Sequence, residues 1–171
     1  MSDYVLYGFL LLAVLFVIYP ALKRSVSGNK LGIKGKLIWV DKGRHTKPFF
    51  NSTFKIFGKP DLMYKIKGGV LAVEYKSRKG SGIYQSDIVQ AKTAALAARG
   101  EGYKVIRILI KTGSNEQYIN LPAADRSLFS EVKQYVDISR QSNKGAFLKA
   151  WPSKFKCRSC AYNHSCNHAC N

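Results

Sequence analysis

The feature that most constrains the fold of this sequence is a pair of strand-like runs joined by two glycines. Residues 61–67 and 70–76 both read as strands, and Gly68-Gly69 between them is typical of a two-residue hairpin turn. With so tight a turn, the expected cross-strand pairs are Lys67 with Val70, Met63 with Glu74, and Asp61 with Lys76. Because side chains alternate between the two faces of a strand, Asp61, Glu74 and Lys76 are expected on one face of the hairpin.

Two carboxylates and a lysine on one face predict a metal-dependent phosphodiesterase site. Opposed and diagonal neighbours on paired strands lie roughly 5 to 8 Å apart, so two carboxylates can hold one cation. A hard divalent cation such as Mg²⁺ or Mn²⁺ takes oxygen ligands, activates a bound water and neutralises charge on a phosphate. A lysine that points into the same site can stabilise an anionic transition state. The alternative is a solvated strand face with one acid and several lysines.

Three short motifs carry a resemblance to a known family: Gly58-Lys59-Pro60-Asp61, Glu74-Tyr75-Lys76-Ser77 and Gln90. They resemble the restriction-endonuclease-like nucleases of the PD-(D/E)xK superfamily, and within it the RecB-like exonucleases associated with CRISPR systems. The resemblance implies that Asp61 and Glu74 are metal ligands, that Lys76 is the catalytic lysine, and that Gln90 lies on a helix near the substrate.

Two positions bear on how far this pattern extends. In the family a tyrosine follows the glutamine by four residues, and here Ala94 occupies that place. The family often has an upstream histidine as a further metal ligand, and His45 is the only histidine before the carboxylates. The resemblance makes His45 a candidate ligand, with an ordinary surface histidine as the alternative.

All four cysteines lie near the C-terminus, as Cys157-x2-Cys160-x5-Cys166-x3-Cys170. Thiolates in a CxxC motif favour binding of zinc or an iron–sulfur cluster. A disulfide is disfavoured if the domain is cytosolic. The RecB-like exonucleases end in a similar tail that binds a [4Fe–4S] cluster, which implies cluster ligands at the first three cysteines. The family takes its fourth ligand from an upstream cysteine, which this chain lacks, so the fourth is expected to be Cys170. The alternative is Zn²⁺, bound by four cysteines or with His164 or His168 in place of one.

Residues 4–22 contain no charged residue and predict a single transmembrane helix. At about 1.5 Å per residue, a helix over this run nearly spans a hydrocarbon core of roughly 30 Å. The basic residues that follow, before the next acid at Asp41, are Lys23, Arg24, Lys30, Lys34 and Lys36. By the positive-inside rule this flank stays cytoplasmic, where it can also contact anionic lipid. A hydrophobic helix used for oligomerisation is the alternative.

The charge of the chain favours a nucleic-acid partner. Twenty-eight lysines and arginines against ten acids give a net charge of +18. The basic residues around the motif are Lys55, Lys59, Lys65, Lys67, Lys76, Arg78 and Lys79. Two acids kept within so positive a region indicate a site that holds cations next to a polyanion, although a solvated basic face explains the charge alone.

The remaining patterns predict a strand over residues 49–57 and a helix capped by Ser86 and ended by Gly100. They also predict strands at 104–111 and 117–121, an amphipathic helix around 128–136, and a linker at 142–145. This order fits an α/β fold, a restriction-endonuclease-like mixed sheet flanked by helices, with an N-terminal transmembrane helix and a small cysteine-rich C-terminal lobe. The expected divisions are an anchor at 1–22, a basic juxtamembrane segment at 23–44, a nuclease core at 45–141 and a cysteine cluster lobe at 142–171.

The leading hypothesis is a membrane-anchored, metal-dependent DNA nuclease with its catalytic domain in the cytoplasm. By resemblance it is an exonuclease that acts on single-stranded DNA ends. The alternative is a membrane-tethered DNA-binding module with a structural or degenerate metal site, which the missing tyrosine at position 94 favours. A third hypothesis is an iron–sulfur or zinc protein that binds a partner at the membrane.

Overall fold

The computed structural model describes residues 31–78, 80–146 and 152–170. The predicted transmembrane run at residues 4–22 lies outside these ranges, as do Lys23, Arg24 and Lys30 of its basic flank. No helix within the described ranges is long and apolar enough to cross a membrane. The chain divides into two compact units between Ser130 and Glu131.

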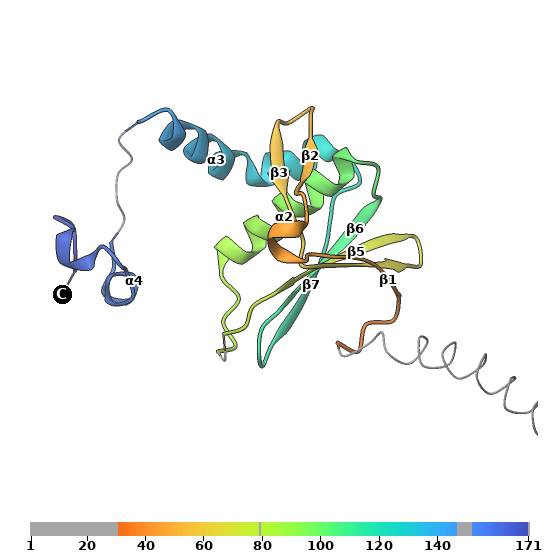
Figure 1. Cartoon of the computed structure of the whole chain (residues 1–171), viewed down its shortest axis with the longest axis horizontal. Coiled ribbons are helices and arrows are strands. Elements are labelled where there is room, and N and C mark those ends of the chain that lie inside the picture. Colours follow the sequence, from red (N-terminus) through yellow and green to blue (C-terminus); the bar gives the residue numbers. More distant parts are fainter. Residues whose placement is uncertain (1–30, 79, 147–151, 171) are drawn as a thin grey trace, which may run out of the picture. The chain divides into compact units, whose positions relative to one another are not determined.

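The first unit is built on a five-stranded sheet in the order β1-β4-β5-β6-β7 (Figure 1). Its strands are β1 (Lys36–Val40), β4 (Leu62–Ile66), β5 (Gly69–Tyr75), β6 (Val105–Lys111) and β7 (Glu116–Asn120). The pair β5–β6 is parallel and the other three pairs are antiparallel. A parallel pair needs a crossover, which helix α2 (Gln85–Gly100) supplies. The predicted mixed α/β sheet is therefore confirmed.

A second, two-stranded sheet joins β2 (Phe49–Asn51) to β3 (Ile56–Gly58), and η1 (Gly43–His45) precedes it. The sequence predicted one strand over residues 49–57, but the chain turns between β2 and β3, with Lys55 at a positive φ of 50°. Helix α2 contacts both strands of this hairpin as well as β5 and β6 (Figure 1).

The central strands explain where the core lies. Strands β5 and β6 are buried along most of their length, as expected for a parallel pair covered on both faces. On one face of β5, Leu71 and Val73 belong to a buried cluster completed by Ile33, Tyr64 and Leu109. Glu74 alternates with these residues and so lies on the opposite face, toward α2.

The β4–β5 hairpin forms, but its predicted register is wrong by two residues. The observed pairs include Ile66 with Gly69, Lys65 with Val70, and Met63 with Ala72. The predicted pairs Lys67 with Val70, Met63 with Glu74 and Asp61 with Lys76 do not occur. Since the shift is an even number of residues, Asp61 and Glu74 still belong to the same face.

The two glycines explain the shift, because they play different roles. Gly68 has a φ of 89° and forms the turn with Lys67, whereas Gly69 is already the first residue of β5. A Cβ atom on Gly69 would lie 2.6 Å from the carbonyl oxygen of Lys104. Gly69 is therefore required by close strand packing and Gly68 by the turn.

Other boundaries also differ from the sequence prediction. Strand β1 was not predicted, because its residues were assigned to the juxtamembrane segment. Helix α2 begins at Gln85, and its N-cap is Tyr84 and not Ser86. The later elements are helix α3 (Asp125–Asn143), helix α4 (Lys154–Arg158) and η2 (Asn163–Ser165). Helix α3 is longer than predicted and extends into the expected linker.

Candidate active site

Asp61 and Glu74 meet where β4 begins and β5 ends. The Asp61 N–H donates to the Val73 carbonyl (3.0 Å), and the Tyr75 N–H donates to Asp61 Oδ2 (2.6 Å). These two bonds fasten Asp61 to β5 on either side of Glu74. The structure thus brings together the two carboxylates that the sequence singled out.

Glu74 is a buried acid with one unsatisfied oxygen. Its side chain is 3% exposed, and Oε1 accepts a hydrogen bond from Lys76 Nζ (2.7 Å). Within the described part of the chain, Glu74 Oε2 is buried and has no hydrogen-bond partner. Burial raises the pKa of Glu74; the Lys76 hydrogen bond opposes this rise and the charge of Asp61 adds to it.

An unpaired buried carboxylate oxygen is costly, and a divalent cation is the partner that would best satisfy it. The second carboxylate, on Asp61, is of the type that Mg²⁺ or Mn²⁺ takes together with water and phosphate. The residues present at Asp61 and Glu74 therefore fit a divalent metal.

Lys76 connects the strand to the helix. Its Nζ also donates to Gln90 Oε1 (2.8 Å) and lies 3.7 Å from Asp87 Oδ1. The ammonium group is thus held between Glu74 on β5 and two polar side chains on α2. The structure thus places Gln90 on α2, within hydrogen-bond distance of Lys76.

Asp87 is a further residue of the candidate site, which the sequence analysis did not identify. It is 5% exposed, and its carboxylate pairs with Arg78 and accepts the Tyr84 N–H (2.9 Å). Burial alone would raise the pKa of Asp87, but the bonds from Arg78 and Tyr84 outweigh it, so the pKa is lowered. Arg78 also donates to the Gly82 carbonyl (2.7 Å), which closes the loop before α2. The one feature of the sequence that could have pointed to Asp87 is its position as an acid in the first turn of the helix.

A second missed acid, Asp41, lies next to Asp61 at the end of β1. Its N–H donates to the Asp61 carbonyl (2.9 Å), and its carboxylate pairs with Lys59 Nζ (2.9 Å). The hydrogen bond from Lys59 lowers the pKa of Asp41. An open pocket of about 420 Å³ lies here, lined by Asp41, Phe57, Gly58, Lys59, Asp61, Gln90, Thr93 and Ala94.

Comparison with known proteins decides the family. A sequence model described as the PD-(D/E)XK nuclease superfamily matches residues 23–167. The chain belongs to this superfamily. Among solved structures, the crystal structure of SSO0001 is similar, with 14% sequence identity, a TM-score of 0.43, and coverage of 93% of this chain and 72% of that chain. No curated protein matches this chain in sequence.

Members of the PD-(D/E)XK superfamily are typically phosphodiesterases and commonly use Mg²⁺ or Mn²⁺. The superfamily's name describes the residue types that Asp61, Glu74 and Lys76 supply here. A nuclease domain implies a nucleic-acid substrate.

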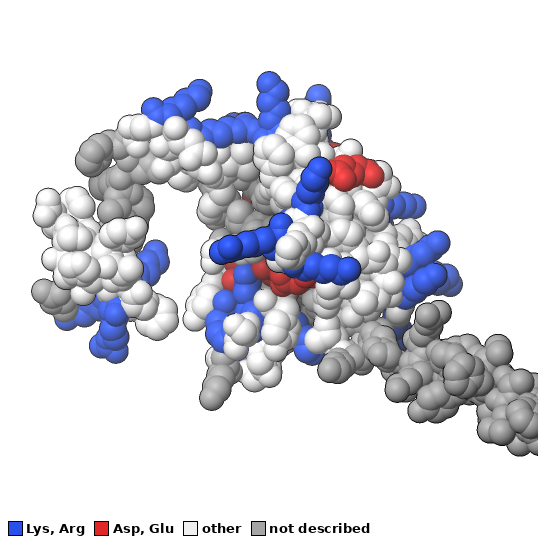
Figure 2. Space-filling view, viewed as in Figure 1, with Lys and Arg blue, Asp and Glu red and all other residues white. Residues whose placement is uncertain are grey.

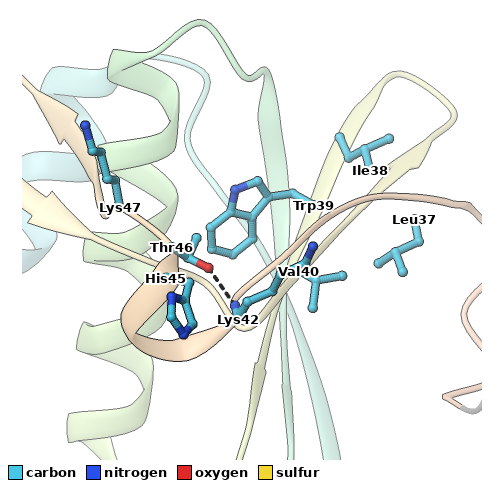
Figure 3. A pocket seen from close by; sticks show the side chains of 8 residues that line it. All are labelled: Leu37, Ile38, Trp39, Val40, Lys42, His45, Thr46 and Lys47. Atoms are coloured by element: carbon cyan, nitrogen blue, oxygen red, sulfur yellow. Dashed lines mark hydrogen bonds between the residues drawn. The ribbon is translucent and has the colours of Figure 1, made fainter.

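His45, the candidate third ligand, lies elsewhere in this PD-(D/E)XK chain. It is exposed on η1 and lines a separate pocket of about 630 Å³ together with Trp39, Lys42, Thr46 and neighbours (Figure 3). In the described ranges, no three histidine, cysteine, aspartate or glutamate side chains gather closely enough to hold a metal ion. The structure therefore does not bring His45 together with Asp61 and Glu74.

Ala94, which stands in place of the family's tyrosine, lies where α2 packs against β3. It is 2% exposed, and a Cβ atom on Gly58 would lie 2.7 Å from the Ala94 Cα. The backbones of β3 and α2 are therefore closely packed at this point. Ala94 also lines the pocket next to Asp61 and Gln90.

In the second unit, two of the four cysteines of the C-terminal tail lie next to each other. All four thiols are free, and Cys157 is buried on α4. The Cys170 N–H donates to Cys157 Sγ (3.3 Å), while Cys160 and Cys166 are exposed. Burial raises the pKa of Cys170, and the neighbouring Cys157 adds to this effect. Of the four predicted ligands, the structure brings Cys170 against Cys157.

Basic side chains surround the acids of the nuclease core. Figure 2 shows acidic atoms near the centre of one face, with lysine and arginine side chains projecting around them. Residues 42–60 contain five basic residues and no acid. These residues lie between Asp41 and Asp61 in the sequence. The segment that joins the two carboxylates is therefore positively charged.

We expect Glu74→Gln to stabilise the metal-free protein at neutral pH. The amide can still accept from Lys76, while the buried charge is removed. Because the folded-state pKa of Glu74 is raised, wild-type stability falls as pH rises between its unfolded and folded pKa values, and the variant lacks this fall. Thermal unfolding from about pH 4 to 8 with EDTA checks this.

The matched control is Glu116→Gln, since Glu116 is exposed and pairs with Lys111 (2.8 Å). Addition of Mg²⁺ or Mn²⁺ should raise the Tm of the wild type and of this control, but not that of Glu74→Gln. A Glu74→Gln protein that is less stable than the control in EDTA, or equally stabilised by metal, would contradict the assignment.

Proposed function

We propose that this protein is a metal-dependent DNA nuclease that hydrolyses phosphodiester bonds as an exonuclease on single-stranded DNA ends. The observation that carries the proposal is the buried oxygen of Glu74, which lies beside Asp61 and Lys76 and has no hydrogen-bond partner among the described residues. Membership of the nuclease superfamily supports hydrolysis of nucleic acid. The preference for single-stranded ends rests on the resemblance to RecB-like exonucleases.

Each residue has a distinct role in this proposal. Asp61 and Glu74 would hold Mg²⁺ or Mn²⁺, which when bound supplies an acidified water and neutralises phosphate charge. Lys76, kept in place by Gln90 and Glu74, presents an ammonium to the anion that develops at the phosphorus. The surrounding lysines and arginines attract the DNA backbone.

We expect Asp61→Ala and Glu74→Ala to abolish metal-stimulated cleavage while DNA binding stays intact or tightens, because each removes a negative charge near phosphate. Lys76→Ala should lower turnover by about 10²-fold or more, as for loss of one transition-state donor. Labelled single- and double-stranded DNA with Mg²⁺ or Mn²⁺ provides the assay.

Glu116→Ala and Lys111→Ala are the matched controls, because they disrupt an exposed acid–lysine pair on β6 and β7. Full activity of the Glu74→Ala variant would contradict the assignment of this site as the nuclease active site. Tight DNA binding by a wild type that cuts no substrate would instead support the alternative, a DNA-binding module with a degenerate site.

We also propose that residues 4–22 anchor the protein in a membrane with the catalytic domain in the cytoplasm. The basis is the charge-free run and its basic flank in the sequence. The full chain should resist extraction by carbonate, whereas a chain that starts at Leu31, and so keeps Ile33 and β1, should be recovered without detergent. Release of the full chain by carbonate would exclude a membrane-spanning anchor.

We further propose that the cysteine tail holds one metal centre, an iron–sulfur cluster by resemblance, with Zn²⁺ as the alternative. Four free thiols within residues 157–170 form a donor set suited to either metal. Cys160→Ser and Cys170→Ser should each lower bound metal and destabilise the tail, since site assembly and folding are coupled.

Metal analysis of anaerobically purified protein, together with absorbance near ~400 nm, measures the outcome. Ser159→Ala, next to Cys160 in the same segment, is the control and should keep its metal. Stoichiometric zinc without iron would exclude the cluster. Full metal content in Cys170→Ser would show that Cys170 is not the fourth ligand.

A further inference from the structure

The β2–β3 hairpin displays a pair of exposed aromatic rings. Phe50 and Phe57 are cross-strand partners whose ring centroids lie 4.5 Å apart with an interplanar angle of 28°. Phe57 is nevertheless 63% exposed and Phe50 37% exposed. Stacked on Phe50, the Phe57 ring still presents most of its surface to solvent, which is unfavourable for an apolar group.

The exposed ring lies at the active site. Phe57 lines the same pocket of about 420 Å³ as Asp61 and Gln90. A substrate whose phosphate approaches Asp61 therefore passes within reach of the Phe57 ring.

The hairpin is also held rigidly. The buried Asn51 side chain donates to the Leu96 carbonyl on α2 (2.9 Å), and the Phe50 N–H donates to Glu101 Oε1 (2.8 Å). Contact between the backbones of Gly58 and Ala94 fixes the other strand. Since the rings are positioned in advance, little conformational entropy is lost when they bind a ligand.

The segment that carries the rings is basic. Between Asp41 and Phe57 the exposed charged residues are Lys42, Arg44, Lys47 and Lys55, and Lys59 lines the pocket beside Phe57. The exposed acid next to the hairpin, Glu101, accepts the Phe50 N–H. A ligand that fits this surface combines flat apolar rings with a chain of negative charge. Single-stranded nucleic acid has both, whereas the bases of a duplex are already stacked on one another.

We propose that the Phe50–Phe57 pair is a stacking platform for an unpaired nucleobase of the strand whose phosphate lies at Asp61 and Glu74. The proposal rests on the proposed nuclease function and gives it a structural source of preference for single strands. Phe57 contacts the base directly, and Phe50 supports its ring from behind.

The test measures binding of labelled single-stranded DNA to the full chain in EDTA, where cleavage does not interfere. Phe57→Leu keeps an apolar side chain but removes the flat ring, so its Kd is expected to rise about tenfold or more, as for loss of one base–aromatic contact. Phe57→Trp should retain wild-type affinity. Tyr118→Leu, a change of an exposed aromatic on β7, is the matched control and should bind as the wild type does.

A strand with abasic residues identifies the contact. It should bind the wild type more weakly than normal DNA, and Phe57→Leu should cause no further loss. Duplex DNA without single-stranded ends should bind both proteins equally. Equal binding of the normal strand by wild type and Phe57→Leu, or an equal loss with normal and abasic strands, would overturn the proposal.

Two further outcomes distinguish failure of the stacking platform from failure of the nuclease function. If the wild type cuts DNA but Phe57→Leu binds normally, the platform is wrong and the nuclease function stands. If no DNA is cut but Phe57→Leu binds only the normal strand more weakly, the platform stands and the nuclease function fails. Loss of binding to anionic phospholipid vesicles alone, with DNA binding unchanged, would overturn the platform in favour of a membrane contact.

Discussion

The arrangement of the site depends on the close packing of helix α2 against the sheet and the β2–β3 hairpin. The buried positions of α2 are mostly alanines: Ala91, Ala94, Ala95, Ala97 and Ala98. Their small side chains let the helix backbone approach β3 closely enough to touch Gly58. In the N-terminal turns of the helix, the same approach brings Asp87 and Gln90 to the Lys76 ammonium. One helix thus positions both the lysine and the hairpin with its exposed rings.

The charges at the site form a chain that runs from the strand into the helix. Glu74 contacts Lys76, Lys76 lies beside Asp87, and Asp87 pairs with Arg78. Alternation of sign offsets much of the desolvation cost of burying two acids. The oxygen of Glu74 that remains outside this chain is the one without a partner in the described residues, and it is the one available to a cation.

The sequence was sufficient for the hairpin and for the placement of Asp61 and Glu74 on one face, because both follow from strand periodicity. It was also sufficient for the mixed sheet, which follows from the order of strands and helices. It was insufficient for the register, since both glycines fit a turn and only packing against Lys104 assigns Gly69 to the strand. Strand β1 was missed because its exposed residues lack a period-two pattern. Asp87 was missed because its burial depends on Arg78, a contact made only when the loop closes.

The crossover through α2 has a consequence for folding. Apart from Asp41, the acids, the lysine and the glutamine of the proposed active site lie between Asp61 and Gln90, in one continuous stretch comprising a hairpin, a loop and the start of a helix. The loops that must close to assemble them are short, and the entropy cost of closing a loop rises with its length. Contacts of this kind favour rapid folding, whereas β1 and β6 join the sheet through more distant partners. Most residues of the proposed nuclease site thus come from contacts that are local in sequence.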